Sequence, residues 1–462
     1  MTSRQRKLNR NSLGRSLSVS LAGIRAGGAL AIDGALQRLR GADDVANDSP
    51  FAKREARRFV AELGRLKGTY VKIGQMFALM GEHFLPPVLT EALHDLHANT
   101  EPLPWDSVEP LLIEALGGRL SELDIEREAF AAASLSQVHR ATIRASGEEI
   151  CLKVQYPGLP DVIDTDFDAV VRMLLVARWV QAGRDLDAWL EDMREALHLE
   201  IDYRREATMG DQMSEQLAAY SSELASQGLH FAVPKRYPRY CSDTVLALEY
   251  MSGHTVTQAE VANLPQERRD QLGRAMLELF FYELYQWGLL QTDPNFGNYL
   301  VRSSQERDEI VLLDFGSTLA PGRDFLGHLG AVIAAGQARD KEAMADGLVG
   351  LGCLQTDAPA EARELFADFC LHLLEPLRIP RDLPREYLNG DGEYRWARSA
   401  LMRRAGKQAA LSASSRHFTT PSREFAMIAR KLSGVFTFIA VLGAEFNAHG
   451  IAKRHIDRWM ED

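Results

Sequence analysis

The chain has 462 residues, of which 46% are hydrophobic and 25% are charged, with a net charge of −11. This length favours two or three lobes over one, and the composition excludes fibrous and disordered classes. The acidic balance argues against a general nucleic-acid binder, so no nucleic-acid partner is expected. The cysteines are scattered without a C-x-x-C pair, which indicates neither a disulfide framework nor a zinc site.

Residues 1–49 form a basic arm, because Arg and Lys recur through the first forty residues against one acid, Asp33. Leu13, Leu17, Leu21 and Ile24 recur at helical spacing. A basic amphipathic helix can lie on an anionic membrane surface, although packing on the protein body would produce the same pattern. The Arg- and Ser-rich composition is also compatible with a mitochondrial transit peptide.

Residues 50–80 show a long helical pattern with a single apolar stripe. Gly64, Gly68 and Gly74 lie within it, and each costs about 1 kcal/mol relative to Ala in a helix interior. Three such glycines predict the close approach of another backbone or a ligand. Lys72 and Gln75 lie in this region, where spacing alone favours an exposed Lys72.

Residues 130–154 change to a period of two. A small-residue turn is followed by strands over 138–143 and 149–154, which predict a β-hairpin. Lys153 lies in the second strand, where a kinase places the lysine that contacts nucleotide phosphates; a lysine at a sheet edge is the alternative. The turn that would cover those phosphates consists of Ala131, Ala132, Ala133 and Ser134.

Two helices are expected over 161–184 and 187–213, and the second carries Glu200, Asp202 and Glu206. A kinase needs a helix glutamate to pair with the strand lysine, so either Glu200 or Glu206 is the candidate partner of Lys153. A solvated acidic face is the alternative. Further strands are expected over 229–233 and 244–250. Glu249 and Met251 lie where adenine would meet the backbone of a kinase.

The most informative stretch is 289–316, which contains Asp293, Asn298 and Asp314. In kinases one Asp orients the attacking hydroxyl, and an Asn and the Asp of an Asp-Phe-Gly turn hold Mg²⁺. Gln291 and Thr292 replace the usual His-Arg, and no Ala-Pro-Glu follows. This combination predicts a kinase-like fold without an ordinary platform for protein substrates. The rest of the chain is predicted to be mostly helical, with no segment long and apolar enough for a membrane span.

In this order the motifs resemble those of the UbiB family of atypical protein-kinase-like proteins, in its branch linked to coenzyme Q biosynthesis. The resemblance covers roughly residues 56–317. It is carried by Lys72-Ile-Gly-Gln75, Ala131-Ala-Ala-Ser134, Lys153-Val-Gln-Tyr-Pro-Gly158, Glu200-Ile-Asp202, Gln291-Thr-Asp-Pro-Asn295 and Asp314-Phe-Gly316.

The resemblance implies specific roles. Lys153 would pair with Glu206, and Asp293, Asn298 and Asp314 would serve Mg²⁺ and phosphoryl chemistry. The helix of Lys72 and Gln75 would fold over the active site as a lid, with Lys72 reaching Glu200 and Asp202. Such a lid would block peptide substrates, so the resemblance implies ATPase or unorthodox kinase activity.

Together these features predict a two-lobed, protein-kinase-like α+β fold with a helical N-terminal extension and a mostly helical C-lobe. The expected divisions are an arm (1–49), a lid extension (50–125), an N-lobe (126–252) and a C-lobe (253–462).

The expected function is Mg²⁺-dependent ATP binding and hydrolysis in support of ubiquinone or isoprenoid-lipid metabolism. A small-molecule or lipid phosphotransferase and a nucleotide-switched scaffold are the alternatives. The resemblance implies peripheral association with anionic lipids, on the cytoplasmic side in a bacterium or the mitochondrial matrix face in a eukaryote. Quinone-biosynthesis enzymes and a second copy of the chain are possible partners.

Overall fold

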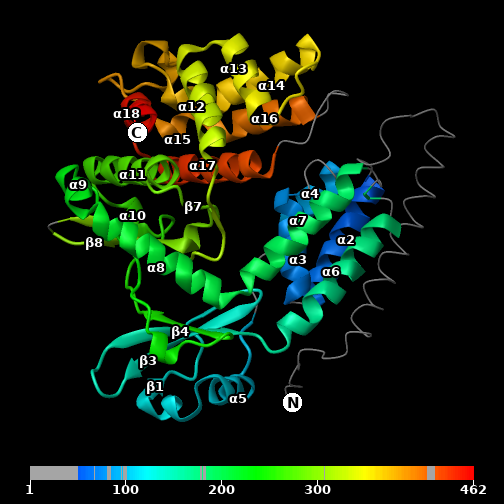
Figure 1. The fold of residues 1–462 in the computed structure, drawn as a ribbon, viewed down its shortest axis with the longest axis vertical. Helices are drawn as coiled ribbons and strands as arrows, with labels where there is room; N and C mark the ends of the chain where they lie inside the picture. Colours follow the sequence, from blue (N-terminus) through cyan, green and yellow to red (C-terminus); the bar gives the residue numbers. More distant parts are fainter. Residues whose placement is uncertain are drawn as a thin grey trace. The chain divides into compact units, whose positions relative to one another are not determined.

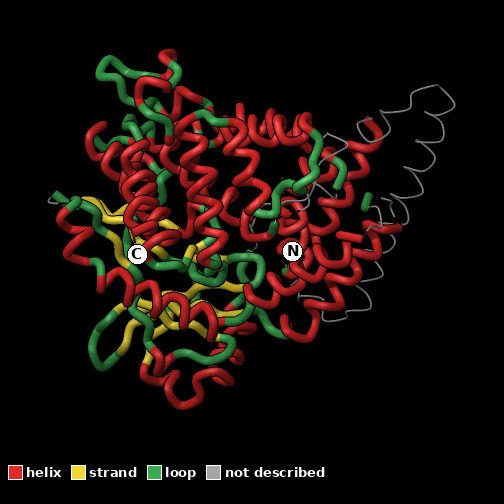
Figure 2. Tube along the Cα trace, turned by 45° about the horizontal axis from the view of Figure 1, so that its top comes forward, coloured by secondary structure: helices red, strands yellow, loops and turns green. Residues whose placement is uncertain are grey.

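The computed structural model describes residues 50–66, 68–80, 85–94, 96, 101–176, 179–180, 184–305, 307–413 and 422–461. The predicted basic arm lies outside these residues. The chain divides into two compact units, Met1–Arg205 with Lys235–Tyr250 and Glu206–Pro234 with Met251–Asp462. Helices make up most of the described chain, and its strands form three small sheets (Figure 2).

The helical part of the first unit begins with two helices where the sequence predicted one. α2 (Pro50–Leu66) ends before Gly68, and α3 (Thr69–Met80) starts directly after it. Gly68 has a φ of 61°, which is left-handed and breaks the helix. The predicted apolar stripe is nonetheless buried. It packs with α4 (Pro87–His94), α6 (Leu159–Val176) and α7 (Arg184–Glu200) around one hydrophobic core (Figure 1).

At Gly74 the close approach predicted from the glycines is made by a side chain, where a second backbone was expected. A Cβ added to Gly74 would lie 2.4 Å from Cδ1 of Leu96, which is itself buried. This contact explains why α3 keeps a glycine in its interior.

The sheet of the first unit confirms the predicted hairpin. β3 (Ser136–Ile143) and β4 (Glu149–Gln155) pair antiparallel, with β1 (Leu123–Ile125) and β6 (Val245–Glu249) on either side. The short strand β2 (Ala131–Ala132) also pairs with β3. α5 (Trp105–Leu116) contributes to the apolar core beneath this sheet. Alternate β4 residues Ile150, Leu152 and Val154 are buried, and this alternation directs Lys153 toward the opposite face.

The second unit surrounds α11 (Gln266–Phe281), which lies beside α17 (Arg423–Leu442) in Figure 1. A π-helical turn, Tyr282–Gln286, follows α11 and leads into the predicted catalytic loop. The small sheets are β5 (Phe231–Ala232), β9 (Asp308–Leu312) and β8 (Tyr299–Ser303), and β10 (Thr318–Leu319) with β7 (Leu290–Gln291). The remaining helices are α8 (Tyr203–Ala219), α9 (Ser221–Ser226), α10 (Ala259–Ala262), α12 (Arg323–Ala338), α13 (Lys341–Gly350), α14 (Ala360–Leu373), α15 (Trp396–Ser399), α16 (Leu401–Ala413) and α18 (His449–Glu461).

The prediction that no segment is long and apolar enough for a membrane span is wrong for α17. This helix has 20 residues and a mean hydropathy of 1.7 over its most apolar window, half of which is buried within the protein. By length and composition it passes the test for a spanning helix, and a core helix passes the same test. Phe425, Ile428, Leu432, Val435 and Phe436 belong to the core of the second unit.

Candidate active site

The three acids predicted on one helix lie around a break between two helices. Glu200 is the last residue of α7, and α8 begins at Tyr203. Asp202 lies between them, and its Oδ1 accepts a hydrogen bond of 3.0 Å from the backbone N–H of Arg205. This is an N-cap contact, so Asp202 starts α8. The predicted single helix over 187–213 is therefore wrong.

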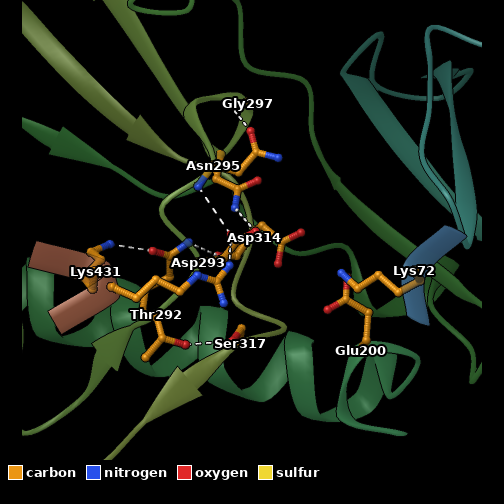
Figure 3. Close-up of polar contacts among 12 residues, drawn as sticks. Lys72, Glu200, Thr292, Asp293, Asn295, Gly297, Asp314, Ser317 and Lys431 are labelled. Carbon is orange, nitrogen blue, oxygen red and sulfur yellow. Dashed lines mark hydrogen bonds and ion pairs between the residues drawn. The ribbon is translucent and has the colours of Figure 1, made fainter. Parts of the chain in front are cut away.

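The structure brings Lys72 and Glu200 together, as the resemblance implied. Nζ of Lys72, on α3, donates to Oε1 of Glu200 at the end of α7 (Figure 3). The two side chains are 20% and 35% exposed, so the pair is accessible to water. Gln75 instead donates to the backbone carbonyl of Leu96 at 3.2 Å. In this motif the lysine therefore contacts an acid, while the glutamine side chain bonds to the backbone of Leu96.

The alanine-rich loop is a short strand and turn closed by backbone hydrogen bonds. Ala131 and Ala132 pair with Val138 and Gln137, and the N–H of Ala133 donates to the carbonyl of Ser136 at 2.8 Å. Ser134 is buried. The alanines therefore form a narrow loop that precedes β3 and pairs with it, at the position where a kinase is expected to carry its phosphate-covering turn.

Lys153 lies on β4 with Nζ 5.3 Å from the centre of the Tyr203 ring, a cation–π contact. Glu206 is buried in the first turn of α8 and falls in the second unit, so its pairing with Lys153 remains a prediction. Glu249 ends β6 and accepts from the backbone N–H of Lys235 at 3.2 Å. Met251 is the first residue after the first unit.

In the predicted catalytic loop, both carboxylate oxygens of Asp293 accept hydrogen bonds. Nδ2 of Asn298 donates to Oδ2 of Asp293 at 2.9 Å, and Arg430 donates to Oδ1 at 3.2 Å. The backbone N–H of Asn295 also donates to Oδ1 at 3.3 Å (Figure 3). A turn of 3-10 helix over Phe296–Asn298 is capped by the Asn295 side chain and returns Asn298 to Asp293. The Asp-to-Asn spacing read from the sequence therefore corresponds to a direct contact.

The Asp-Phe-Gly turn is fixed by contacts within the second unit. Oδ1 of Asp314 accepts from the N–H of Gly316 at 2.9 Å, and Phe315 is buried. The Asp314 carbonyl accepts from Nε2 of Gln291 at 3.1 Å. A Cβ added to Gly316 would lie 3.9 Å from Oε2 of Glu206, which places that carboxylate beside the turn.

Arg430 and Lys431, two neighbouring residues of α17, are site contacts that the sequence analysis missed. Nζ of Lys431 donates to Oε1 of Gln291 at 2.6 Å and also contacts the Tyr299 hydroxyl. Both residues lie far from the predicted catalytic loop in the sequence. Arg430 comes 137 residues after Asp293, and Lys431 comes 140 residues after Gln291. The available sequence signal was a pair of adjacent cations within an otherwise apolar helix.

Lys431 lies in a fully buried polar cluster with Gln291, Tyr299 and Glu283 of the π-helical turn. Its Nζ is 3.9 Å from Oε2 of Glu283, beyond hydrogen-bonding distance. Burial raises the pKa of Glu283 to about 7, while the charge of Lys431 opposes that rise. Burial also lowers the pKa of Lys431. The cluster therefore contains an acid and a base whose charges are costly to maintain.

The donor set suits Mg²⁺ better than a transition metal. Asp314 and Asn298 offer hard oxygen ligands, which Mg²⁺ prefers. No group of three or more His, Cys, Asp or Glu residues that could hold a metal ion occurs in the described part of the chain. Mg²⁺ usually binds one or two carboxylates together with substrate phosphates, so these residues fit an ion that arrives with a nucleotide.

Comparisons with known proteins show which family the chain belongs to. Residues 95–347 match the model of the ABC1 atypical kinase-like domain. The chain is 28% identical over 408 residues to a Caenorhabditis elegans protein named "Atypical kinase coq-8, mitochondrial", covering 87% of this chain and 51% of that protein. It is 26% identical to "Atypical kinase COQ8, mitochondrial" of Saccharomyces cerevisiae, covering 86% and 75%.

The chain thus spans about half the length of the first of these relatives. Among solved structures, the complex of Rv3197 with erythromycin from Mycobacterium tuberculosis matches with a TM-score of 0.59 at 22% identity, covering 87% of this chain and 95% of that one. This likeness supports the predicted kinase-like α+β fold. Because the domain model covers more than half of its residues, the chain belongs to the ABC1 family of atypical kinase-like proteins.

Proposed function

We propose that this chain binds ATP with Mg²⁺ and hydrolyses it slowly, in support of ubiquinone or related isoprenoid-lipid metabolism. The observation that carries the proposal is the Asp293 carboxylate, which is held between Asn298 and Arg430. A carboxylate fixed in this way can accept a proton from an attacking water or hydroxyl. Asn298 and Asp314 would hold Mg²⁺, which would neutralise charge on the phosphates.

In the first unit, Lys153 and the alanine-rich loop would contact the nucleotide, with Glu206 as the predicted partner of Lys153. Glu249 and Met251 would lie at the adenine. The Lys72–Glu200 contact favours a lid role for α3, and a lid disfavours peptide substrates. Hydrolysis, or transfer to a small acceptor, is therefore a better account than protein phosphorylation.

The metabolic setting comes from the relatives, which carry the names of mitochondrial COQ8 atypical kinases. By this reasoning the chain acts at a membrane surface rich in anionic lipids, alongside quinone-biosynthesis enzymes. In a eukaryote that surface would face the mitochondrial matrix, and in a bacterium the cytoplasm. Self-association as a homodimer is part of the same proposal.

Thermal unfolding of the full chain with Mg²⁺-ATP, Mg²⁺-ADP and metal-free nucleotide tests the site. A ligand at about 100 times its dissociation constant adds roughly 2.7 kcal/mol to the native state. We expect a Mg²⁺-dependent stabilisation that is lost in Asp314→Asn and kept in Asp324→Asn, an exposed acid on α12. Phosphate release and analysis for a phosphorylated acceptor then separate hydrolysis from transfer. No stabilisation by any nucleotide would overturn the proposal.

A further inference from the structure

The catalytic loop brings no cation of its own to phosphoryl transfer. Residues 289–300 read LLQTDPNFGNYL and include neither Lys nor Arg. Phosphoryl transfer concentrates negative charge beside the residue that orients the nucleophile, and arginines supplied from elsewhere commonly offset that charge. In the second unit, α17 brings the guanidinium of Arg430 to Asp293.

Three contacts place one face of α17 along this loop. Arg430 donates to Asp293 at 3.2 Å, and Lys431 donates to Gln291 at 2.6 Å. A Cβ added to Gly434 would lie 2.0 Å from Cβ of Pro294, so at this position the helix backbone rests directly on the loop. Residues 430 and 434 are one turn apart on the same helix face. The contacts are therefore a continuous docking of the helix onto the loop.

The Arg430–Asp293 pair is better suited to positioning than to stability. Its side chains are 31% and 32% exposed, and ion pairs with this exposure contribute little to folding. By contrast, the two Asp293 oxygens are bonded by donors from different directions, Arg430 at Oδ1 and Asn298 at Oδ2. Because a charge-assisted hydrogen bond is directional, this arrangement fixes the rotation of the carboxylate.

We infer that Arg430 is a positioning residue of the reaction, which holds the Asp293 carboxylate in its reactive orientation from α17. The inference rests on the proposed ATP chemistry and adds a role to a helix that no motif indicated. Lys431 helps to fix the neighbouring part of the loop. It donates to Gln291, which in turn donates to the backbone carbonyl of Asp314. One helix turn therefore orders both halves of the phosphoryl-transfer machinery in the second unit.

The test is steady-state release of phosphate from Mg²⁺-ATP by the full-length wild type, Arg430→Ala and Arg430→Lys. The control is Arg423→Ala, which changes an arginine two turns earlier, about 10 Å along the helix axis. A misplaced catalytic group loses roughly ten- to a hundredfold in kcat. We expect that loss in Arg430→Ala with KM for Mg²⁺-ATP unchanged, partial recovery in Arg430→Lys, and wild-type behaviour in Arg423→Ala.

Guanidinium ion added at a subdenaturing concentration tests the positioning role directly, because it would not restore kcat if Arg430 were only structural. It should raise kcat of Arg430→Ala and leave kcat of Arg423→Ala unchanged, and unfolding temperatures verify that both variants are folded. An unchanged kcat, a higher kcat or a raised KM alone in Arg430→Ala would each overturn the inference. A wild type that neither binds nor turns over Mg²⁺-ATP would overturn the proposed function and this inference together. An active wild type with an indifferent Arg430→Ala overturns the inference alone.

Discussion

Lys72 in the first unit and Lys431 in the second are both helix lysines beside a glutamate, but their surroundings differ. Lys72 is 20% exposed and directly contacts Glu200. Lys431 is 1% exposed, lies 3.9 Å from an equally buried Glu283 and bonds instead to Gln291. A partly exposed pair can open at a small cost, whereas a buried polar cluster strongly resists the loss of one member. The Lys72–Glu200 contact therefore suits an element that moves, whereas the cluster around Lys431 suits an element that stays in place.

The largest effect is expected from removing the buried cation. Lys431→Met should lower the free energy of unfolding by about 3 kcal/mol, because it leaves Glu283 buried without its counter-charge and removes one of the two donors to Oε1 of Gln291. Chemical denaturation measures this change. The matched control is Lys453→Met on α18, whose partner Asp457 is about as exposed as itself, and which should cost less than about 0.5 kcal/mol. Equal losses of stability in Lys431→Met and Lys453→Met would show that burial does not distinguish the two lysines.

The same cluster should show in the pH dependence of stability. Burial raises the pKa of Glu283 from 4.5 to about 7, so the folded protein holds this proton more tightly than the unfolded chain. The stability from Glu283 is therefore fully present below pH 4.5 and is lost as pH rises through about 7. The lowered pKa of Lys431 contributes the opposite slope, because there the unfolded chain holds its proton more tightly than the folded protein.

Glu283→Gln should remove that loss, by an amount on the order of 2 kcal/mol between pH 5 and 8. The measurement is the difference in unfolding free energy between wild type and variant at several pH values. A difference that does not vary with pH would show that Glu283 keeps one protonation state throughout.

The smallest effect is expected at the lid contact. Lys72→Met should lower stability by about 0–1 kcal/mol, and added salt should shrink the difference, because both partners are accessible to water. Denaturation of Arg65→Met, which removes an exposed pair with Glu62 on α2, gives the reference value. A loss of several kcal/mol at Lys72 alone would mean that α3 is held rigidly and would argue against a lid.

Much of this architecture could be predicted because its signals are local. Alternating burial in β4 is visible as alternating sequence, and the spacing of Asp293 and Asn298 became a hydrogen bond through one short turn. The resemblance also anticipated the contact of Lys72 with Glu200, 128 residues apart. The two helix breaks were missed because each depends on a single residue, a left-handed Gly68 and the capping Asp202, and both residue types are also tolerated inside continuous helices.

The contribution of α17 could not be predicted for a different reason. Arg430 and Lys431 meet the catalytic loop only after the intervening helices have packed, and their spacing carries no motif.

The close packing of Pro294 against Gly434 of α17 limits which residues these two positions can hold. With a Cβ at position 434 only 2.0 Å from Cβ of Pro294, the two positions exclude each other's side chains. Lineages that acquire a larger residue at 434 would need a smaller one at 294, or a displaced loop with altered chemistry. The two positions should therefore change together among relatives, because they join α17 to the predicted catalytic loop.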